Sequence, residues 1–174
     1  MYAACLNSHP SNIPIAGAFD FEAAFPSVIH DWIWMVLQHR RMPLHFIRLF
    51  KSSYKNARAI HTHKGKTHTL ISFLCGVLQG CPASAFLFNN ALGPFLMNFD
   101  NVLRAHNAGI VRACADDIGI SLRRSKHLQL IYPIYQDCKE FGGLALKPIK
   151  CVLVPLCEYT NDIENKIKKW IADN

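Results

Sequence analysis

Two short apolar runs on either side of an Asp-Asp pair constrain this chain more than any other stretch. They extend from Ile110 to Leu122 and carry β-branched residues on both sides of the acids. This pattern predicts a tight hairpin with the carboxylates of Asp116 and Asp117 at its tip. Asp tolerates turn conformations well, so an adjacent Asp pair alone is also typical of a solvated surface turn.

A third acid, far upstream, changes that interpretation. Asp20 follows an apolar run from Ile13 to Phe19, so it too is expected at the end of a strand. Carboxylates that converge from two strand ends repel each other unless a positive charge lies between them. Hard oxygen ligands of this kind suit Mg²⁺, and two metal ions about 3.5–4 Å apart suit nucleotidyl transfer. The three acids therefore predict a candidate two-metal site.

The net charge of the chain indicates the class of its partner. Nineteen Lys and Arg against twelve Asp and Glu give a formal charge of +7 over 174 residues. A basic surplus around a small acidic cluster fits a polyanionic partner with a metal site inside, although an inert basic surface has the same composition. With 51% hydrophobic residues the chain can bury a core, and we expect one domain over residues 1–174.

Cysteine usage and hydropathy indicate an intracellular protein, nuclear or cytoplasmic and not secreted. The seven Cys show no paired C-x-x-C spacing and lie in apolar runs, as expected of reduced and mostly buried thiols. No secretory signal begins the chain. Residues 69–99 carry no charge, but Gln79, Gly80 and Pro82 are among the residues that interrupt them, so we expect a buried segment and no membrane partner.

Periodicity and turn signals predict a mixed order of strands and helices. Ser27 and Ser84 are expected helix N-caps, and Gly142-Gly143 ends a later helix. The predicted strands are 13–20, 58–63, 67–73, 110–114, 118–122 and one within 144–156 that includes Lys147 and Lys150; the predicted helices are 27–38, 43–55, 84–104, 125–141 and 160–171. Without the 58–73 insertion the order predicts an α+β, ferredoxin-like fold, an antiparallel sheet backed by helices.

Two smaller patterns lie between Asp20 and the Asp116-Asp117 pair. Residues 76–84 form a glycine-punctuated loop that leads into a helix, and glycine lets the backbone come close to a ligand or simply turn sharply. The loop has neither a dinucleotide nor a phosphate-loop spacing. His61, His63 and His68 have no nearby Cys or acid partners, so an exposed strand face is a better interpretation than a metal site.

Four motifs in order resemble the palm domain of reverse transcriptases, most closely those of non-LTR retrotransposons. Residues 19–25 (FDFEAAF) are similar to the first catalytic motif of that family, and residues 76–84 (GVLQGCPAS) to its G-V-x-Q-G-C-P-x-S loop. Residues 115–117 are similar to the end of the Y/F-A-D-D box, and residues 143–150 to the downstream G-L-x-L-N-x-x-K element. The resemblance covers residues 13 to about 153 and implies a polymerase palm at about 13–155, followed by a terminal helix at about 160–171.

The resemblance implies roles for the acids and their neighbour. Asp20 and Asp116 would hold two Mg²⁺ ions, for which Mn²⁺ is a possible substitute, with Asp117 beside them and the Phe21 carbonyl as a further ligand. One ion would lower the pKa of the primer 3′-OH, and the other would hold the triphosphate and the leaving pyrophosphate.

Further residues are implied around the nucleotide. Phe25 falls at the family's steric gate, which excludes a ribonucleotide 2′-OH. Gln79 and Gly80 would line the nucleotide and template pocket. Lys150 falls at the proposed proton donor to pyrophosphate, although a lysine at this place is equally compatible with a solvated loop.

The chain also departs from the family pattern. Cys114 replaces the usual Tyr or Phe, Ala23 the usual Lys, and Lys147 the usual Asn. Because the chain starts close to the first motif, we expect the fingers, a full thumb, an endonuclease and an RNase H region to be missing. A palm without them should position its substrates poorly and extend a primer at most feebly.

The resemblance implies an RNA-directed DNA polymerase fragment of a retroelement protein. Its partners would be an RNA template, a DNA or RNA primer and deoxynucleoside triphosphates. A catalytically silent, palm-like nucleic-acid-binding module is the alternative from another class. An RNA-dependent RNA polymerase palm is a second alternative, against which Gln79, Gly80 and Phe25 argue.

Overall fold

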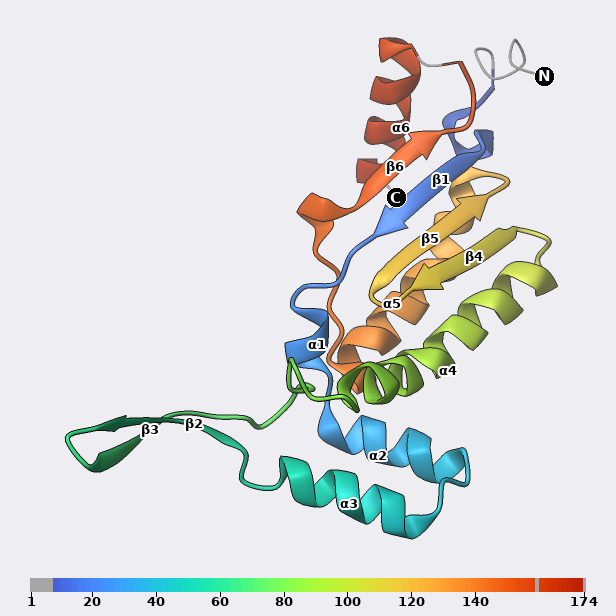
Figure 1. Ribbon diagram of the computed structural model, residues 1–174. Coiled ribbons are helices and arrows are strands. Elements are labelled where there is room, and N and C mark those ends of the chain that lie inside the picture. Colours follow the sequence, from blue (N-terminus) through green and yellow to red (C-terminus); the bar gives the residue numbers. More distant parts are fainter. Residues whose placement is uncertain (1–7, 159, 174) are drawn as a thin grey trace.

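The computed structural model of the chain describes residues 8–158 and 160–173 and is built around one antiparallel sheet (Figure 1). The sheet has four strands in the order β4-β5-β1-β6. The strands are β1 (Ile15–Phe19), β4 (Gly109–Cys114), β5 (Asp117–Leu122) and β6 (Val152–Pro155). Helices α4 (Ser84–Ala105) and α5 (Leu128–Gly142) cover one face of the sheet (Figure 1). The predicted α+β, ferredoxin-like arrangement is therefore confirmed.

The remaining elements extend this core at both ends (Figure 1). They are η1 (Pro10–Asn12), α1 (Ala24–Ser27), α2 (His30–His39), α3 (Leu44–Tyr54), β2 (Arg58–His63), β3 (Lys66–Ser72), η2 (Ser125–His127), η3 (Pro148–Lys150) and α6 (Asn161–Asp173). Helix α6 packs Ile163 and Ile167 against Ile13, next to the first strand. Helices α2 and α3 lie beyond the opposite end of the sheet, and the β2–β3 hairpin projects from them (Figure 1).

Alternation along the strands gives the sheet one covered and one open face. In β5, Ile118, Ile120 and Leu122 are buried, whereas Asp117 and Gly119, which alternate with them, are exposed. The buried residues pack with the α4 and α5 side chains in one hydrophobic core. Full burial of each aliphatic side chain contributes about 1.5–3 kcal/mol, so the core determines which face of each strand points outward.

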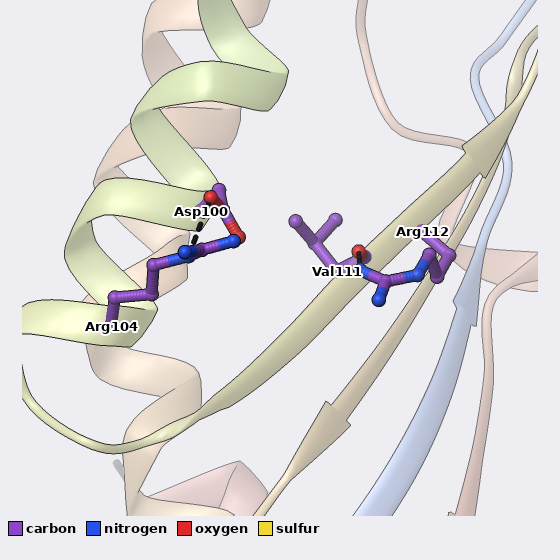
Figure 2. Close-up of polar contacts among 4 residues, drawn as sticks. All are labelled: Asp100, Arg104, Val111 and Arg112. Carbon is purple, nitrogen blue, oxygen red and sulfur yellow. Dashed lines mark hydrogen bonds and ion pairs between the residues drawn. The ribbon is translucent and has the colours of Figure 1, made fainter.

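Strand β4 is an edge of the sheet, and it lies beside helix α4 (Figure 2). The guanidinium of Arg112 donates to the carbonyl of Val111 at 2.7 Å, so one backbone acceptor in this edge strand has a side-chain partner. On α4, Arg104 pairs with Asp100 at 2.7 Å, one helical turn earlier. Such exposed i,i+4 pairs contribute only about 0.3–0.5 kcal/mol, so packing rather than charge holds α4 in place.

The predicted 58–73 hairpin is confirmed, but the expected burial of residues 69–99 is wrong for its first part. Strands β2 and β3 form a separate two-stranded sheet, and every residue of β3 is exposed. Leu70 is 65% exposed and Leu74 is 86% exposed. No further layer covers this ribbon in the described part of the chain, so apolar character alone did not predict burial. No described helix is both long and apolar enough to cross a bilayer.

Three local expectations need correction. Ser27 ends α1, and Ile29 is the N-cap of α2 without a side-chain hydrogen bond. Ala83 is the N-cap of α4, while the Ser84 hydroxyl donates to the Leu78 carbonyl at 2.5 Å and so serves the preceding loop. Lys147 and Lys150 lie outside the last strand, since Pro148 begins a 3₁₀ turn and cannot donate to a sheet ladder.

Candidate active site

The three acids of the sequence motifs come from adjacent strands at one end of the sheet. Phe19, the last residue of β1, pairs with Ile118 of β5, and Asp117 pairs with Cys114 of β4. Extending the β1–β5 register by one residue places Asp20 directly across from Asp117. Side chains in such positions point to the same face with Cβ atoms about 4.5–5.5 Å apart. The register therefore brings the acids of two distant motifs together on the open face.

The turn between β4 and β5 presents Asp116. Its two-residue loop is Ala115-Asp116, and Ala115 has a φ of 54°. A positive φ at only the first loop position is the pattern of a type II′ turn, whose twist matches that of the flanking strands. An L-residue in this region is strained, so the alanine holds the turn at a local cost. Cys114 is exposed, so it does not fill core space as an aromatic side chain would.

Lys150 lies among these acids. Its Nζ is 2.9 Å from Oδ2 of Asp20, whose carboxylate is largely shielded from solvent. The hydrogen bond with Asp20, supported by the negative charges of Asp20, Asp116 and Asp117, raises the pKa of the Lys150 ammonium above its ordinary value. Lys150 is therefore charged at neutral pH and offsets part of the repulsion between the carboxylates.

Backbone hydrogen bonds hold this lysine segment against the end of β1. The amide of Lys147 donates to the Asp20 carbonyl at 2.9 Å, and the amide of Glu22 donates to the Ala145 carbonyl at 2.7 Å. Phe21, between them, bridges to Leu146. The segment that follows Gly143 is thus attached to the Asp20 segment residue by residue, which explains how Lys150 reaches the acids.

The donor chemistry of the site fits a hard divalent cation. Asp20, Asp116 and Asp117 offer only oxygen ligands, which Mg²⁺ and Mn²⁺ prefer. No group of three or more His, Cys, Asp or Glu side chains among residues 8–158 and 160–173 is already arranged around a metal position. With the Lys150 ammonium on Asp20, the carboxylates would have to turn from this cation to a metal ion.

Helix α1 and the glycine loop of residues 76–84 pack against each other. The Phe25 ring stacks on Phe88 of α4, with centroids 4.5 Å apart and planes at 12°. The amides of Val77 and Gly76 donate to the carbonyls of Phe25 and Val28, each at 2.7 Å. Gly76 has a φ of 82°, and a Cβ there would lie 2.3 Å from the Pro26 carbonyl oxygen. Only glycine permits this close contact of the loop with α1.

Gln79 and Gly80 lie on the exposed tip of the same loop. The loop is supported from behind, because the Leu78 amide donates to the Tyr54 hydroxyl at 3.3 Å and Tyr54 contacts the Ser84 hydroxyl at 3.4 Å. Gly80 has a φ of 87°, and a Cβ placed there would have no atom within 4 Å. Glycine is therefore favoured at this position by the backbone conformation and not by lack of space. Both residues remain available for contact with a partner.

Two supporting residues were missed at the sequence level. His30 contacts the Gly76 carbonyl through Nε2 at 2.7 Å and so holds the glycine loop; no sequence signal pointed to it. Tyr135 of α5 packs its ring against Phe19 and Phe21, at 5.1 and 6.3 Å between centroids, behind the Asp20 strand. Its spacing from Ile131 on one helix face could have identified Tyr135 as a core residue.

Comparison of the sequence with protein families identifies one that spans most of the chain. The family described as reverse transcriptase (RNA-dependent DNA polymerase) matches residues 3–163. Among curated proteins, the Transposon TX1 uncharacterized 149 kDa protein of Xenopus laevis is 26% identical over 175 residues. That match covers 89% of this chain but only 13% of the frog protein.

Solved structures with the same fold include telomerases. Apo telomerase from Candida tropicalis, truncated from its C-terminal domain, matches with a TM-score of 0.67 at 13% identity, over 86% of this chain and 32% of that chain. Telomerase from Candida albicans in complex with the TWJ fragment of telomeric RNA matches with a TM-score of 0.55 at 12% identity, over 88% and 29%. At these identities the likeness concerns the fold alone.

Proposed function

The chain belongs to the reverse transcriptase (RNA-dependent DNA polymerase) family, and from that premise we propose that it is the palm of an RNA-directed DNA polymerase. It would add deoxynucleotides to a primer 3′-OH on an RNA template. The observation that carries this proposal is the register that sets Asp20 beside Asp117 and the Asp116 turn, with Lys150 paired with Asp20. The 13% coverage of the transposon protein supports a piece of a longer retroelement protein.

The acids of this site would bind the divalent ions. Asp20 and Asp116 would hold two Mg²⁺ or Mn²⁺ ions, with Asp117 beside them and the Phe21 carbonyl as a further oxygen ligand. Bound ions of this kind lower the pKa of an attacking hydroxyl and neutralise the charge that develops on the phosphates. The protein contributes position, because the strand register and the Ala115 turn hold the carboxylates before any substrate arrives.

Lys150 has two consecutive roles in this proposal. Without metal, its ammonium pairs with Asp20 and limits repulsion within the acidic cluster. With substrate bound, the released ammonium would face the triphosphate and give a proton to the leaving pyrophosphate oxygen. The raised pKa applies to the pair with Asp20, and the released ammonium would act as a general acid towards the more basic pyrophosphate oxygen that develops beside it.

The surface formed by α1 and the glycine loop of residues 76–84 would select the nucleotide. Phe25, held in place by its stack on Phe88, would lie under the sugar and exclude a 2′-OH. Gln79 and Gly80, on the exposed loop tip, would line the nucleotide and template pocket.

The proposed partners are an RNA template, a DNA or RNA primer and deoxynucleoside triphosphates. Residues 1–174 would act as one domain, with the palm at about 13–155 and a terminal helix at about 160–171.

Primer extension by the purified 174-residue chain tests the proposal. We expect slow incorporation of deoxynucleotides on an RNA template that requires Mg²⁺ or Mn²⁺. Asp116→Asn should lower the rate by about 10³-fold or more, because metal-held charge stabilisation contributes several kcal/mol. Asp173→Asn, which changes an exposed acid at the end of α6, is the matched control and should leave the rate unchanged. Extension that survives Asp116→Asn would contradict the assignment.

Two further measurements separate the proposal from a silent nucleic-acid-binding module. Mn²⁺ binding, followed by its paramagnetic resonance signal, should weaken at least tenfold in Asp20→Asn and Asp116→Asn. A wild-type chain that binds duplex but neither Mn²⁺ nor nucleotide would be the silent module.

Phe25→Val should increase ribonucleotide incorporation relative to deoxynucleotide incorporation, and an unchanged ratio would remove the steric-gate role.

A further inference from the structure

The positive charge of the chain is concentrated in one segment. Residues 44–72, which comprise α3 and the β2–β3 hairpin, contain six Lys and Arg and no Asp or Glu. The other 145 residues contain thirteen Lys and Arg against all twelve Asp and Glu. This segment, named here the basic arm, therefore accounts for nearly all of the +7 charge.

The cations of the basic arm have no acidic partner among residues 8–158 and 160–173. None of the four ion pairs in the described residues involves the basic arm. Lys51 lies over the Trp34 ring at 5.9 Å, and Arg58 donates to the Asn56 carbonyl at 3.4 Å, so these two are held locally without being neutralised. Their charge remains available to a partner.

The cations follow the arm from end to end. Arg48, Lys51 and Lys55 are spaced by three and four residues, so they lie along one side of α3. Arg58 begins β2, and Lys64 and Lys66 lie at the hairpin tip. Figure 1 shows the hairpin continuing outward from the end of α3. At about 1.5 Å per helical residue and 3.3 Å per strand residue, the two elements together span about 36 Å.

The hairpin itself is built for contact rather than for packing. His61 pairs with His68, and His63 pairs with Lys66, so the tip end of one face carries imidazole and ammonium groups. Thr62 and Thr67 pair on the other face, with their hydroxyls 3.4 Å apart. Lys, Arg and Thr are side chains that commonly bind phosphate oxygens of nucleic acids. An isolated two-stranded ribbon is only marginally stable in water, so a partner would also order it.

We propose that the basic arm binds the sugar–phosphate backbone of a nucleic acid duplex outside the carboxylate site. Its length of about 36 Å corresponds to about ten base pairs at 3.4 Å each, so successive cations can neutralise successive phosphates. The proposal rests on the proposed function only for the choice of nucleic acid as the polyanion. It assigns the basic arm to anchoring the duplex, while Asp20 and Asp116 serve the reacting end.

Fluorescence anisotropy of the 174-residue chain with a labelled 20-base-pair RNA–DNA duplex, measured over a salt series, tests the proposal. For a duplex, each phosphate contact contributes about 0.9 to the slope of log K against log salt. Lys64→Gln/Lys66→Gln should therefore lower the slope by about 2, and Arg48→Gln/Lys51→Gln/Lys55→Gln by about 3. Affinity near 0.1 M salt should fall about tenfold or more in both variants.

Two control variants make the test specific. Lys126→Gln/Lys139→Gln removes two exposed charges outside the basic arm and should change the slope by less than half as much. Asp173→Asn should bind the duplex as tightly as the wild type, and the arm variants should retain wild-type Mn²⁺ binding, so failure of the polymerase assignment and failure of the arm are distinguishable. Amide exchange in residues 58–72 should slow when duplex is added.

Three results would overturn the proposal. Arm variants that retain the wild-type slope would exclude phosphate contacts at these residues. A control variant that loses as much affinity as the arm variants would show that charge acts without a defined site. Arm-dependent binding to phosphatidylserine vesicles with unchanged duplex binding would identify a membrane surface as the partner instead.

Discussion

Two β-hairpins of the same construction lie in opposite environments in this molecule. The β4–β5 hairpin turns through Ala115-Asp116, and the β2–β3 hairpin turns through Lys64-Gly65. Both loops have two residues, yet the first hairpin is joined by β1 and covered by helices, while the second pairs with no further strand in the described chain. One presents acids and the other presents lysines.

The difference shows what a covering layer does for function. Burial of one face fixes the β4–β5 hairpin in register, so its acids have defined neighbours, Asp20 and Lys150. The β2–β3 hairpin has no such layer, so its geometry is determined only by its own turn and cross-strand pairs. Catalytic ligands need fixed positions, such as those in the covered β4–β5 hairpin. A cationic surface that follows a long phosphate backbone is compatible with the uncovered β2–β3 hairpin.

The largest expected effect compares the same substitution in the two hairpins. Ile118→Ala removes a buried side chain, 1% exposed, and should lower the free energy of unfolding by about 2–5 kcal/mol. Ile71→Ala removes a side chain that is 59% exposed and should change the free energy of unfolding by at most about 0.5 kcal/mol. Urea unfolding followed by circular dichroism measures both. Equal losses would mean that the β2–β3 hairpin is packed against the rest of the chain.

A smaller effect is expected from two glycines with positive φ. Gly76→Ala should destabilise the protein by about 2–3 kcal/mol, because the strained φ of 82° is combined with a Cβ contact of 2.3 Å to the Pro26 carbonyl oxygen. Gly65→Ala has a φ of 74° but open space around it, so about 1 kcal/mol is expected, confined to the hairpin. Thermal unfolding and amide exchange distinguish a global loss from a local one. A Gly76→Ala protein as stable as the wild type would show that the loop can leave α1.

The smallest effect concerns the acidic turn. Ala115→Gly should raise the free energy of unfolding by about 0.5–1 kcal/mol, because relief of the positive-φ strain at φ 54° exceeds the added chain entropy of glycine. Chemical denaturation of the two proteins side by side measures the change. A loss of stability instead would mean that the Ala115 methyl group makes a contact that outweighs the strain.

Local patterns predicted much of the fold. Alternation in residues 110–122 and 58–73 predicted both hairpins, and turn residues predicted the end of α5 at Gly142, where the C-cap Gly143 has a φ of 74°. N-caps were predicted less well, because Ser27 and Ser84 satisfy the usual cap preference but take other positions in the fold. Residues 69–74 were expected to be buried because they are apolar, and only the position of β3 outside the core shows that they are exposed.

The order of side chains along the chain was sufficient to indicate the strands and the acids at their ends, since these depend on spacing and turn chemistry. The tertiary structure decided which of these features meet. Asp20 and Asp117 are 97 residues apart and become neighbours only through the β1–β5 register. Lys150 reaches them only because residues 145–147 bond to the backbone at residues 20–22. The physical reason is that a shared core and a ladder of hydrogen bonds determine distances between remote residues, which local propensity cannot encode.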